Sequence, residues 1–128
     1  MTPLEILHTW KIFAVVGLSP RPERPSHSVA TQLKMRGYTI IPVNPGCEEI
    51  LGERCYPDLL SIPGPVEVVD IFRRSELVPP IVDQAIAIGA KVVWMQLGVI
   101  NDEAAAKARA AGLEVVMNRC PAIELSRE

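Results

Sequence analysis

The sequence has few aromatic residues and no excess of positive charge, and each shortage argues against a class of function. Aromatic residues make up 5% of the 128 residues, too few for a platform on which nucleic-acid bases stack. The 13 Lys and Arg residues are outnumbered by 15 Asp and Glu residues, which gives a formal net charge of −2. Proteins that grip nucleic acid normally carry a basic excess instead. We therefore expect no nucleic-acid partner.

Long apolar runs are absent too. No run approaches the roughly 20 residues needed to span a bilayer, and the N-terminus lacks the charged-then-apolar pattern of a signal peptide. These absences predict a soluble, cytoplasmic protein that has no membrane partner.

Cysteine and histidine are also scarce. The three cysteines, Cys47, Cys55 and Cys120, are odd in number and contain no CxxC spacing, which argues against a disulfide framework and a zinc cage. His8 and His27 are the only imidazoles, and no HExxH or HxH occurs. We expect reduced thiols of a cytosolic protein and no metal site.

No catalytic constellation is recognisable either. The sequence contains no Ser-His-Asp order, no paired catalytic carboxylates and no GxxxxGK[ST] pattern. The candidate site residues are therefore expected to bind a ligand rather than to catalyse a reaction.

The sequence does contain short apolar runs that alternate with helical segments. Its length and its 48% of hydrophobic residues predict a single domain over residues 1–128. A continuous run such as residues 12–16 fits a strand buried on both faces, as in parallel sheets. Strands are expected at residues 12–16, 38–43, 66–72, 91–96 and 113–117. Helices are expected at residues 3–10, from about 26 to 36, near 58–62, and at 77–88, 101–111 and 122–127.

Capping signals support several helix starts. Thr2 and Glu5 form a capping-box pattern around Pro3, and Asn101 precedes a segment with acidic residues in its first turn. Ser26 or Ser28 is expected to cap the second helix.

This alternation defines the fold class. Strands that alternate with helices imply right-handed crossovers and a parallel sheet covered on both faces. We predict an α/β protein with a Rossmann-like, doubly wound, three-layer α/β/α fold and a mainly parallel five-stranded sheet in the order 3-2-1-4-5. Ligands of such sheets bind beyond the carboxyl ends of the strands, near the first strand, so the loops that follow the strands hold the candidate site.

The loop after the first strand, residues 17–28, predicts an anion site. It leads from a strand into a helix, where free N–H groups and the helix dipole favour phosphate. Arg21 and Arg24 add charge suited to bidentate phosphate contacts, and Ser19 and Ser26 add hydroxyl donors. The alternative is a solvated proline-rich turn that leads into a helix.

This loop departs from the dinucleotide fingerprint. Only Gly17 stands where GxGxxG has three glycines, and Asn44 and Pro45 follow the second strand where an NAD site usually has an acidic residue. An NAD site is weakened by these departures but not excluded. NADP is the stronger form, because arginines can also hold its 2′-phosphate.

Other loop residues leave two interpretations open. Arg73 either reaches a ligand phosphate or is solvated, and His27 either contacts a ligand or packs in the loop. Asp70, inside an apolar run, either marks the wet end of its strand or pairs locally, because buried ions are costly unless paired. Cys120 is either reactive or an inert small residue.

Five segments in order resemble the CoA-binding domain family, specifically its small stand-alone bacterial members. The likeness covers about residues 6–123. The segments are Ala14-Val15-Val16-Gly17-Leu18-Ser19 with Arg24-Pro25-Ser26-His27; Val43-Asn44-Pro45; Val69-Asp70-Ile71-Phe72-Arg73-Arg74-Ser75-Glu76; Val93-Trp94-Met95-Gln96-Leu97-Gly98; and Asn118-Arg119-Cys120-Pro121.

The resemblance implies a Rossmann-like fold and a site for coenzyme A. The first loop would hold the phosphates, Asn44 and Pro45 would line the adenosine end, and residues 96–98 would lie along the pantetheine arm. The full set of residues implied to bind the cofactor is Gly17, Leu18, Ser19, Pro20, Arg21, Arg24, Ser26, His27, Asn44, Pro45, Arg73, Gln96, Leu97 and Gly98.

The same domain forms the front of the succinyl-CoA synthetase alpha subunit, whose activity needs a phosphorylated-histidine domain and a beta subunit. With 128 residues, this chain has no room for that domain. The resemblance therefore implies binding of coenzyme A or an acyl-coenzyme A without ligase activity. The alternatives are an NAD(P)-binding domain or small oxidoreductase, and a regulatory or scaffolding domain with an empty pocket and a protein partner.

Overall fold

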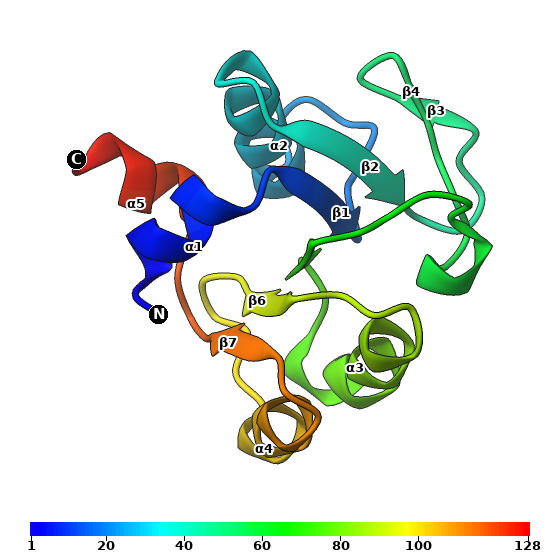
Figure 1. Ribbon diagram of the computed structural model, residues 1–128. Helices are drawn as coiled ribbons and strands as arrows, with labels where there is room; N and C mark the ends of the chain where they lie inside the picture. Colours follow the sequence, from blue (N-terminus) through cyan, green and yellow to red (C-terminus); the bar gives the residue numbers. More distant parts are fainter.

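The computed structural model describes residues 1–128 and contains a five-stranded parallel sheet between two layers of helices (Figure 1). Its strands are β1 (Ile12–Val16), β2 (Thr39–Val43), β5 (Val68–Ile71), β6 (Val92–Met95) and β7 (Glu114–Val116). All neighbouring pairs are parallel, in the order β2-β1-β5-β6-β7. The predicted α/β, Rossmann-like, three-layer class is confirmed.

The predicted strand order is wrong. With the sheet strands numbered along the chain, the order is 2-1-3-4-5 rather than 3-2-1-4-5, because β5 pairs with β1 and not with β2. After β2 the chain forms a small antiparallel hairpin, β3 (Glu49–Ile50) and β4 (Glu53–Arg54). Tyr56 then bridges Val43 at the end of β2. This segment therefore lies beside the end of β2, at the edge of the sheet. The chain then crosses to the other side of β1, where β5 pairs with it.

Each face of the sheet carries its own hydrophobic cluster. The helices α1 (Pro3–Thr9), α2 (Pro25–Met35) and α5 (Pro121–Ser126) pack on the face that holds Phe13 and Trp94. The helices α3 (Val78–Ala87) and α4 (Asp102–Ala110) pack on the opposite face, as Figure 1 shows. Two short 3-10 helices, η1 (Leu59–Ser61) and η2 (Ser75–Leu77), complete the fold. No helix is both long enough and apolar enough to cross a membrane.

The caps agree with the sequence at two helices and differ at a third. The Glu5 amide donates to Thr2 Oγ1 (3.2 Å), and the Thr2 amide donates to Glu5 Oε1 (2.8 Å). Asn101 caps α4 through the Ala104 amide (2.9 Å). The expectation that Ser26 or Ser28 caps α2 is wrong. The N-cap is Arg24 with no side-chain cap, because Pro25 takes the first helical position.

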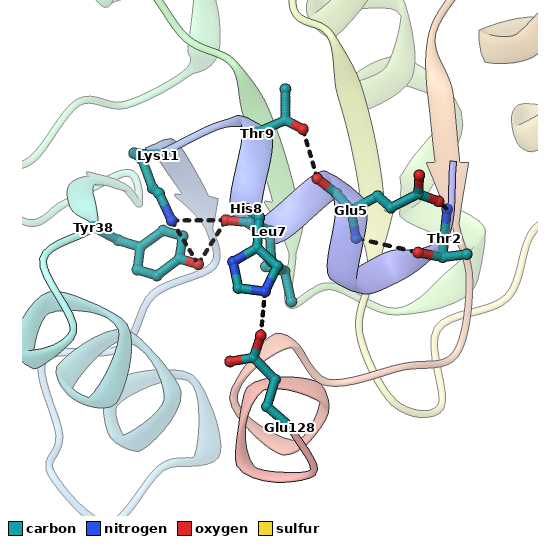
Figure 2. Close-up of polar contacts among 8 residues, drawn as sticks. All are labelled: Thr2, Glu5, Leu7, His8, Thr9, Lys11, Tyr38 and Glu128. Carbon is teal, nitrogen blue, oxygen red and sulfur yellow. Dashed lines mark hydrogen bonds and ion pairs between the residues drawn. The ribbon is translucent and has the colours of Figure 1, made fainter.

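Polar contacts fasten α1 to the rest of the molecule (Figure 2). The Tyr38 hydroxyl and the Lys11 ammonium both donate to the Leu7 carbonyl, at 2.7 and 3.0 Å. His8 contacts the carboxylate of Glu128 at the other end of the chain. These contacts hold both termini on the same side of the sheet.

Candidate functional site

A groove of about 1120 Å³ opens where β1, β5 and β6 end. β2 pairs with one side of β1 and β5 with the other, so the strand order reverses its direction at β1. Parallel α/β sheets bind ligands at such a switch point. The groove is lined by residues from five segments: 17–32, 72–74, 96–99, the N-cap of α5 and α5 itself.

Gly17 lets two of these segments come together. Its backbone has φ of +87°, and a Cβ atom there would lie 2.3 Å from the Phe72 carbonyl oxygen. Its amide donates to the Val43 carbonyl (2.8 Å). A side chain at this position would therefore push the loop after β1 away from the loop after β5.

The loop after β1 is held by its own serines. The Ser19 amide donates to Ser26 Oγ (3.0 Å), and the Arg21 amide donates to Ser19 Oγ (3.1 Å). Ser26 is buried in the first turn of α2 and lines the groove. With no side-chain cap on α2, the positive end of the helix dipole is left facing the groove, an arrangement that favours a bound anion.

The charged lining of the groove is entirely basic, and no Asp or Glu lines it. Two of its arginines make ion pairs within their own loops, Arg21 with Glu23 (3.3 Å) and Arg74 with Glu76 (3.4 Å). These pairs are well exposed, so they are worth little and leave both guanidinium groups available. The four groove arginines are Arg21, Arg24, Arg73 and Arg74.

Gln96 carries an unsatisfied acceptor at the groove. Its side chain is 6% exposed, and its Oε1 atom has no hydrogen-bond partner. Buried polar groups are normally paired, and this oxygen is itself shielded from solvent, so a ligand donor reaches it only if the Gln96 side chain turns toward the groove. The neighbouring Gly98 donates its amide to Asn118 Oδ1 (2.7 Å).

Asn118 was not among the expected binding residues. Its backbone has φ of +60°, a conformation that asparagine tolerates better than most residues. The signal available in the sequence was its place after the last strand, in one of the family-like segments.

Asp70 lies inside the sheet and not in the groove. It is paired in register with Val15 and Trp94, is fully buried, and has no partner for either carboxylate oxygen. Burial raises its pKa well above the ordinary value. The expectation that Asp70 marks a wet strand end or pairs locally is therefore wrong, because its carboxyl group is buried within the sheet without a partner.

The groove brings together most of the residues expected from the sequence. These are Gly17, Ser19, Arg21, Arg24, Ser26, Arg73, Gln96, Leu97 and Gly98. It also contains residues that sequence reasoning missed. Phe72, Val29 and Ile123 form an apolar part of the lining together with Cys120, and in the sequence they look like any other core residues.

The remaining expected residues lie outside the groove lining. Leu18 is fully buried in the core, and Pro20 is exposed. His27 has Thr31 Oγ1 3.5 Å from its Nδ1 atom. Asn44 braces the first loop by donating its Nδ2 to the Leu18 carbonyl (2.9 Å). Pro45 lines a second cavity of about 270 Å³, which Arg73 borders as well.

The fold and the groove together define a parallel α/β domain with a groove lined by basic side chains at the switch point of its sheet. Residues 11–126 match the CoA binding domain family. The chain belongs to that family.

Several relatives illustrate how widely this domain is used. The uncharacterised protein YneT of Bacillus subtilis is 43% identical over 116 residues, which cover 91% of this chain and 86% of YneT. A hypothetical protein from Pyrococcus horikoshii has a solved structure with a TM-score of 0.94 and 47% identity, covering 99% of this chain and 92% of that one. An ADP-forming acetate–CoA ligase of Archaeoglobus fulgidus is 36% identical over 81 residues, which are 63% of this chain and only 12% of the ligase.

Proposed function

We propose that this protein binds coenzyme A, or an acyl-coenzyme A, in the groove at the switch point. The observation that carries the proposal is the charge of the groove: four arginines line it and no acidic residue does, in a chain whose net charge is −2. Positive charge is thus concentrated where a polyphosphorylated ligand would lie. Arginine is suited to this task because its planar fork contacts phosphate oxygens in pairs.

The apolar part of the groove suits the other half of the ligand. Phe72, Val99 and Ile123 offer surface to an aliphatic arm. The side-chain amide of Gln96, which lines the groove, is suited to hydrogen bonding with another amide, and the pantetheine arm of coenzyme A contains two amides. Phosphates at the arginines and an amide at Gln96 would engage both chemical parts of one molecule.

A nicotinamide nucleotide fits the same groove less well. NAD sites usually place an acidic residue after the second strand to hold the ribose hydroxyls, and here Asn44 and Pro45 stand there. The Asn44 amide group already donates to the Leu18 carbonyl. Family membership also favours coenzyme A. The ligase activity of the relative is not proposed for this chain, because only 12% of that enzyme is matched.

Calorimetric titration of the purified protein with coenzyme A, acetyl-coenzyme A, NADH and NADPH in parallel tests the proposal. We expect coenzyme A to bind with a dissociation constant tighter than about 100 µM, which is roughly −5.5 kcal/mol. The double variant Arg21→Ala/Arg24→Ala should weaken binding, because a hydrogen bond to a charged group contributes about 1.5–3 kcal/mol.

Arg109→Ala supplies a matched control. Arg109 is exposed on α4, which packs on the face of the sheet opposite α2, and its replacement makes the same arginine-to-alanine change, with the loss of one positive charge rather than two, without touching the groove. Equal affinities in the groove variant and the control would contradict the role of the arginines. Preference for a nicotinamide would indicate a redox function, and no binding of any of the four would favour an interaction domain.

A further inference from the structure

Two of the three cysteines lie together outside the groove, in the hairpin that follows β2. The Cys55 amide donates to the Glu48 carbonyl (2.8 Å), and Cys47 packs against the hydrophobic cluster to which Cys55 belongs. In a regular antiparallel hairpin, neighbouring positions would turn these side chains to opposite faces. A bend at Glu48 interrupts that alternation, and, after burial, a hydrogen bond between the Cys47 and Cys55 side chains is one of the causes that raise the pKa of the Cys55 thiol.

This cysteine pair is connected to the candidate site through Asn44. The Cys55 thiol donates to the Asn44 carbonyl (3.4 Å), and the Asn44 amide donates to the Tyr56 carbonyl (2.9 Å). The Asn44 side chain in turn donates to the Leu18 carbonyl (2.9 Å), directly before the loop that lines the groove. A change at Cys55 therefore has a short route of hydrogen bonds to the groove.

We propose that Cys47 and Cys55 are a reversible dithiol–disulfide pair whose oxidation alters ligand binding in the groove. The oxidant we assign is a low-molecular-weight disulfide. The Cys47 thiolate attacks it, forms a mixed disulfide and releases one small thiol. The Cys55 thiolate then attacks the Cys47 sulfur and releases the second small thiol. Two protein thiols are oxidised, one small disulfide is reduced, and two protons leave the protein thiols and are taken up by the two released thiolates.

The order of attack follows from the surroundings of each thiol. Cys47 is half-buried and more accessible than Cys55, which is buried. Burial, together with the neighbouring Cys47, raises the pKa of Cys55. A thiol with a raised pKa is a poor first nucleophile in exchange reactions. Once Cys47 carries the mixed disulfide, Cys55 is already beside it and can complete the reaction.

Oxidation removes the hydrogen that Cys55 donates to Asn44. The Asn44 carbonyl then loses a partner while its side chain still holds Leu18, so the brace beneath the first loop is altered. The thiol chemistry is independent of the proposed function, whereas the effect on coenzyme A rests on it. We expect the affinity for coenzyme A to differ between the reduced and oxidised proteins by about fivefold or more, the lower end of typical coupling between sites.

The first test is equilibration of the native, full-length protein with oxidised glutathione, followed by thiol counting and peptide mapping. We expect the three free thiols to fall to one, with Cys47 joined to Cys55 and Cys120 still reduced. The variant Cys55→Ser should stop at the first step and retain glutathione on Cys47. Three surviving thiols, or a disulfide that involves Cys120, would overturn the proposal.

The second test compares coenzyme A titrations of the reduced and oxidised wild-type protein, with a Cys47→Ser protein given the same treatment as the matched control. Affinity should change on oxidation in the wild type and stay constant in the variant. Equal affinities in both wild-type forms would refute the coupling. If neither form binds coenzyme A, the proposed function fails, while the thiol count still decides whether the pair forms.

Discussion

Asp70 places a carboxyl group in the middle of a strand whose other residues are apolar. An ionised carboxylate with no partner is very costly in such surroundings, and both of its oxygens are unpartnered. Neutralisation lowers this cost, which is why the pKa is raised by burial. The residue therefore imposes a pH dependence on the stability of the whole domain.

Replacing Asp70 with asparagine should remove that dependence. Because the folded-state pKa lies above the unfolded value of about 3.9, the folded chain binds more protons between the two values, and stability falls as the pH rises through this window. Asp70→Asn should match the wild type near pH 3 and exceed it at pH 8, by more than the roughly 0.5 kcal/mol of an ordinary surface change. Urea unfolding at pH 3, 5 and 8 measures this difference.

The surface variant Glu103→Gln is the control, because it makes the same carboxyl-to-amide change on the exposed side of α4. Parallel stability curves for the wild type and Asp70→Asn would show that folding does not raise the pKa of Asp70.

Asp70 also shows what sequence reasoning cannot supply for a single residue. The apolar run around it correctly indicated a buried strand, but the sequence left open whether Asp70 marks a solvated strand end or pairs locally, and the structure shows a buried carboxyl group with no partner. Only the register with Val15 and Trp94 reveals this, because the burial of Asp70 depends on strands that are distant in sequence.

At the scale of elements, α1 is too short to be stable alone. It has seven residues, and isolated helices shorter than about 12 residues are marginal in water. Its capping box and the contacts of Leu7 and His8 drawn in Figure 2 compensate for this. Glu5 has its pKa lowered by hydrogen bonds from the Thr2 backbone and side chain.

The substitution Thr2→Ala should therefore destabilise the protein by about 1 kcal/mol, the usual effect of losing an N-cap side chain.

For Glu5, the pKa in the folded state is lower than the pKa in the unfolded state. The stabilisation that Glu5 contributes is therefore present above the unfolded-state pKa and is lost as the pH falls through the folded-state pKa. Glu5→Gln should abolish this acid-side loss. Urea unfolding at pH 7 and pH 3 tests both changes, and a Thr2→Ala variant as stable as the wild type would contradict the role of the box.

The elements that sequence reasoning missed are those without a periodic signal. The strands β3 and β4 have two residues each, too short for an alternation to be read. Their turn contains Leu51 and Gly52, with φ of +55° and +76°, whereas the usual signal for such a turn is Asn-Gly or Asp-Gly. Because the hairpin was not predicted, nothing in the sequence indicated that β5, the third strand of the sheet, pairs with β1 rather than with β2.

At the scale of the whole molecule, the net charge of the chain does not reveal the basic groove. A net charge of −2 describes an average, while the groove gathers four arginines from two loops and excludes acidic residues. The position of those loops was predictable, because parallel strands end at one edge of the sheet. The apolar lining contributed by α5 was not, since that helix reaches the groove only through its packing against α2 and α1.

Hydrogen exchange in the presence of coenzyme A tests the placement of the ligand across the molecule. Because the groove joins segments that are distant in sequence, one ligand should slow exchange in residues 19–26, 96–99 and 120–123 together. At a ligand concentration of 100 times the dissociation constant, the free energy of unfolding should also rise by about 2.7 kcal/mol. Residues 57–59 line the second cavity. Their exchange should slow only as much as the increase in the global free energy of unfolding requires, with no additional local protection. Local protection of 57–59 with none at 96–99 would move the ligand to the second cavity, and the arginine that borders both cavities, Arg73, would then be its main phosphate contact.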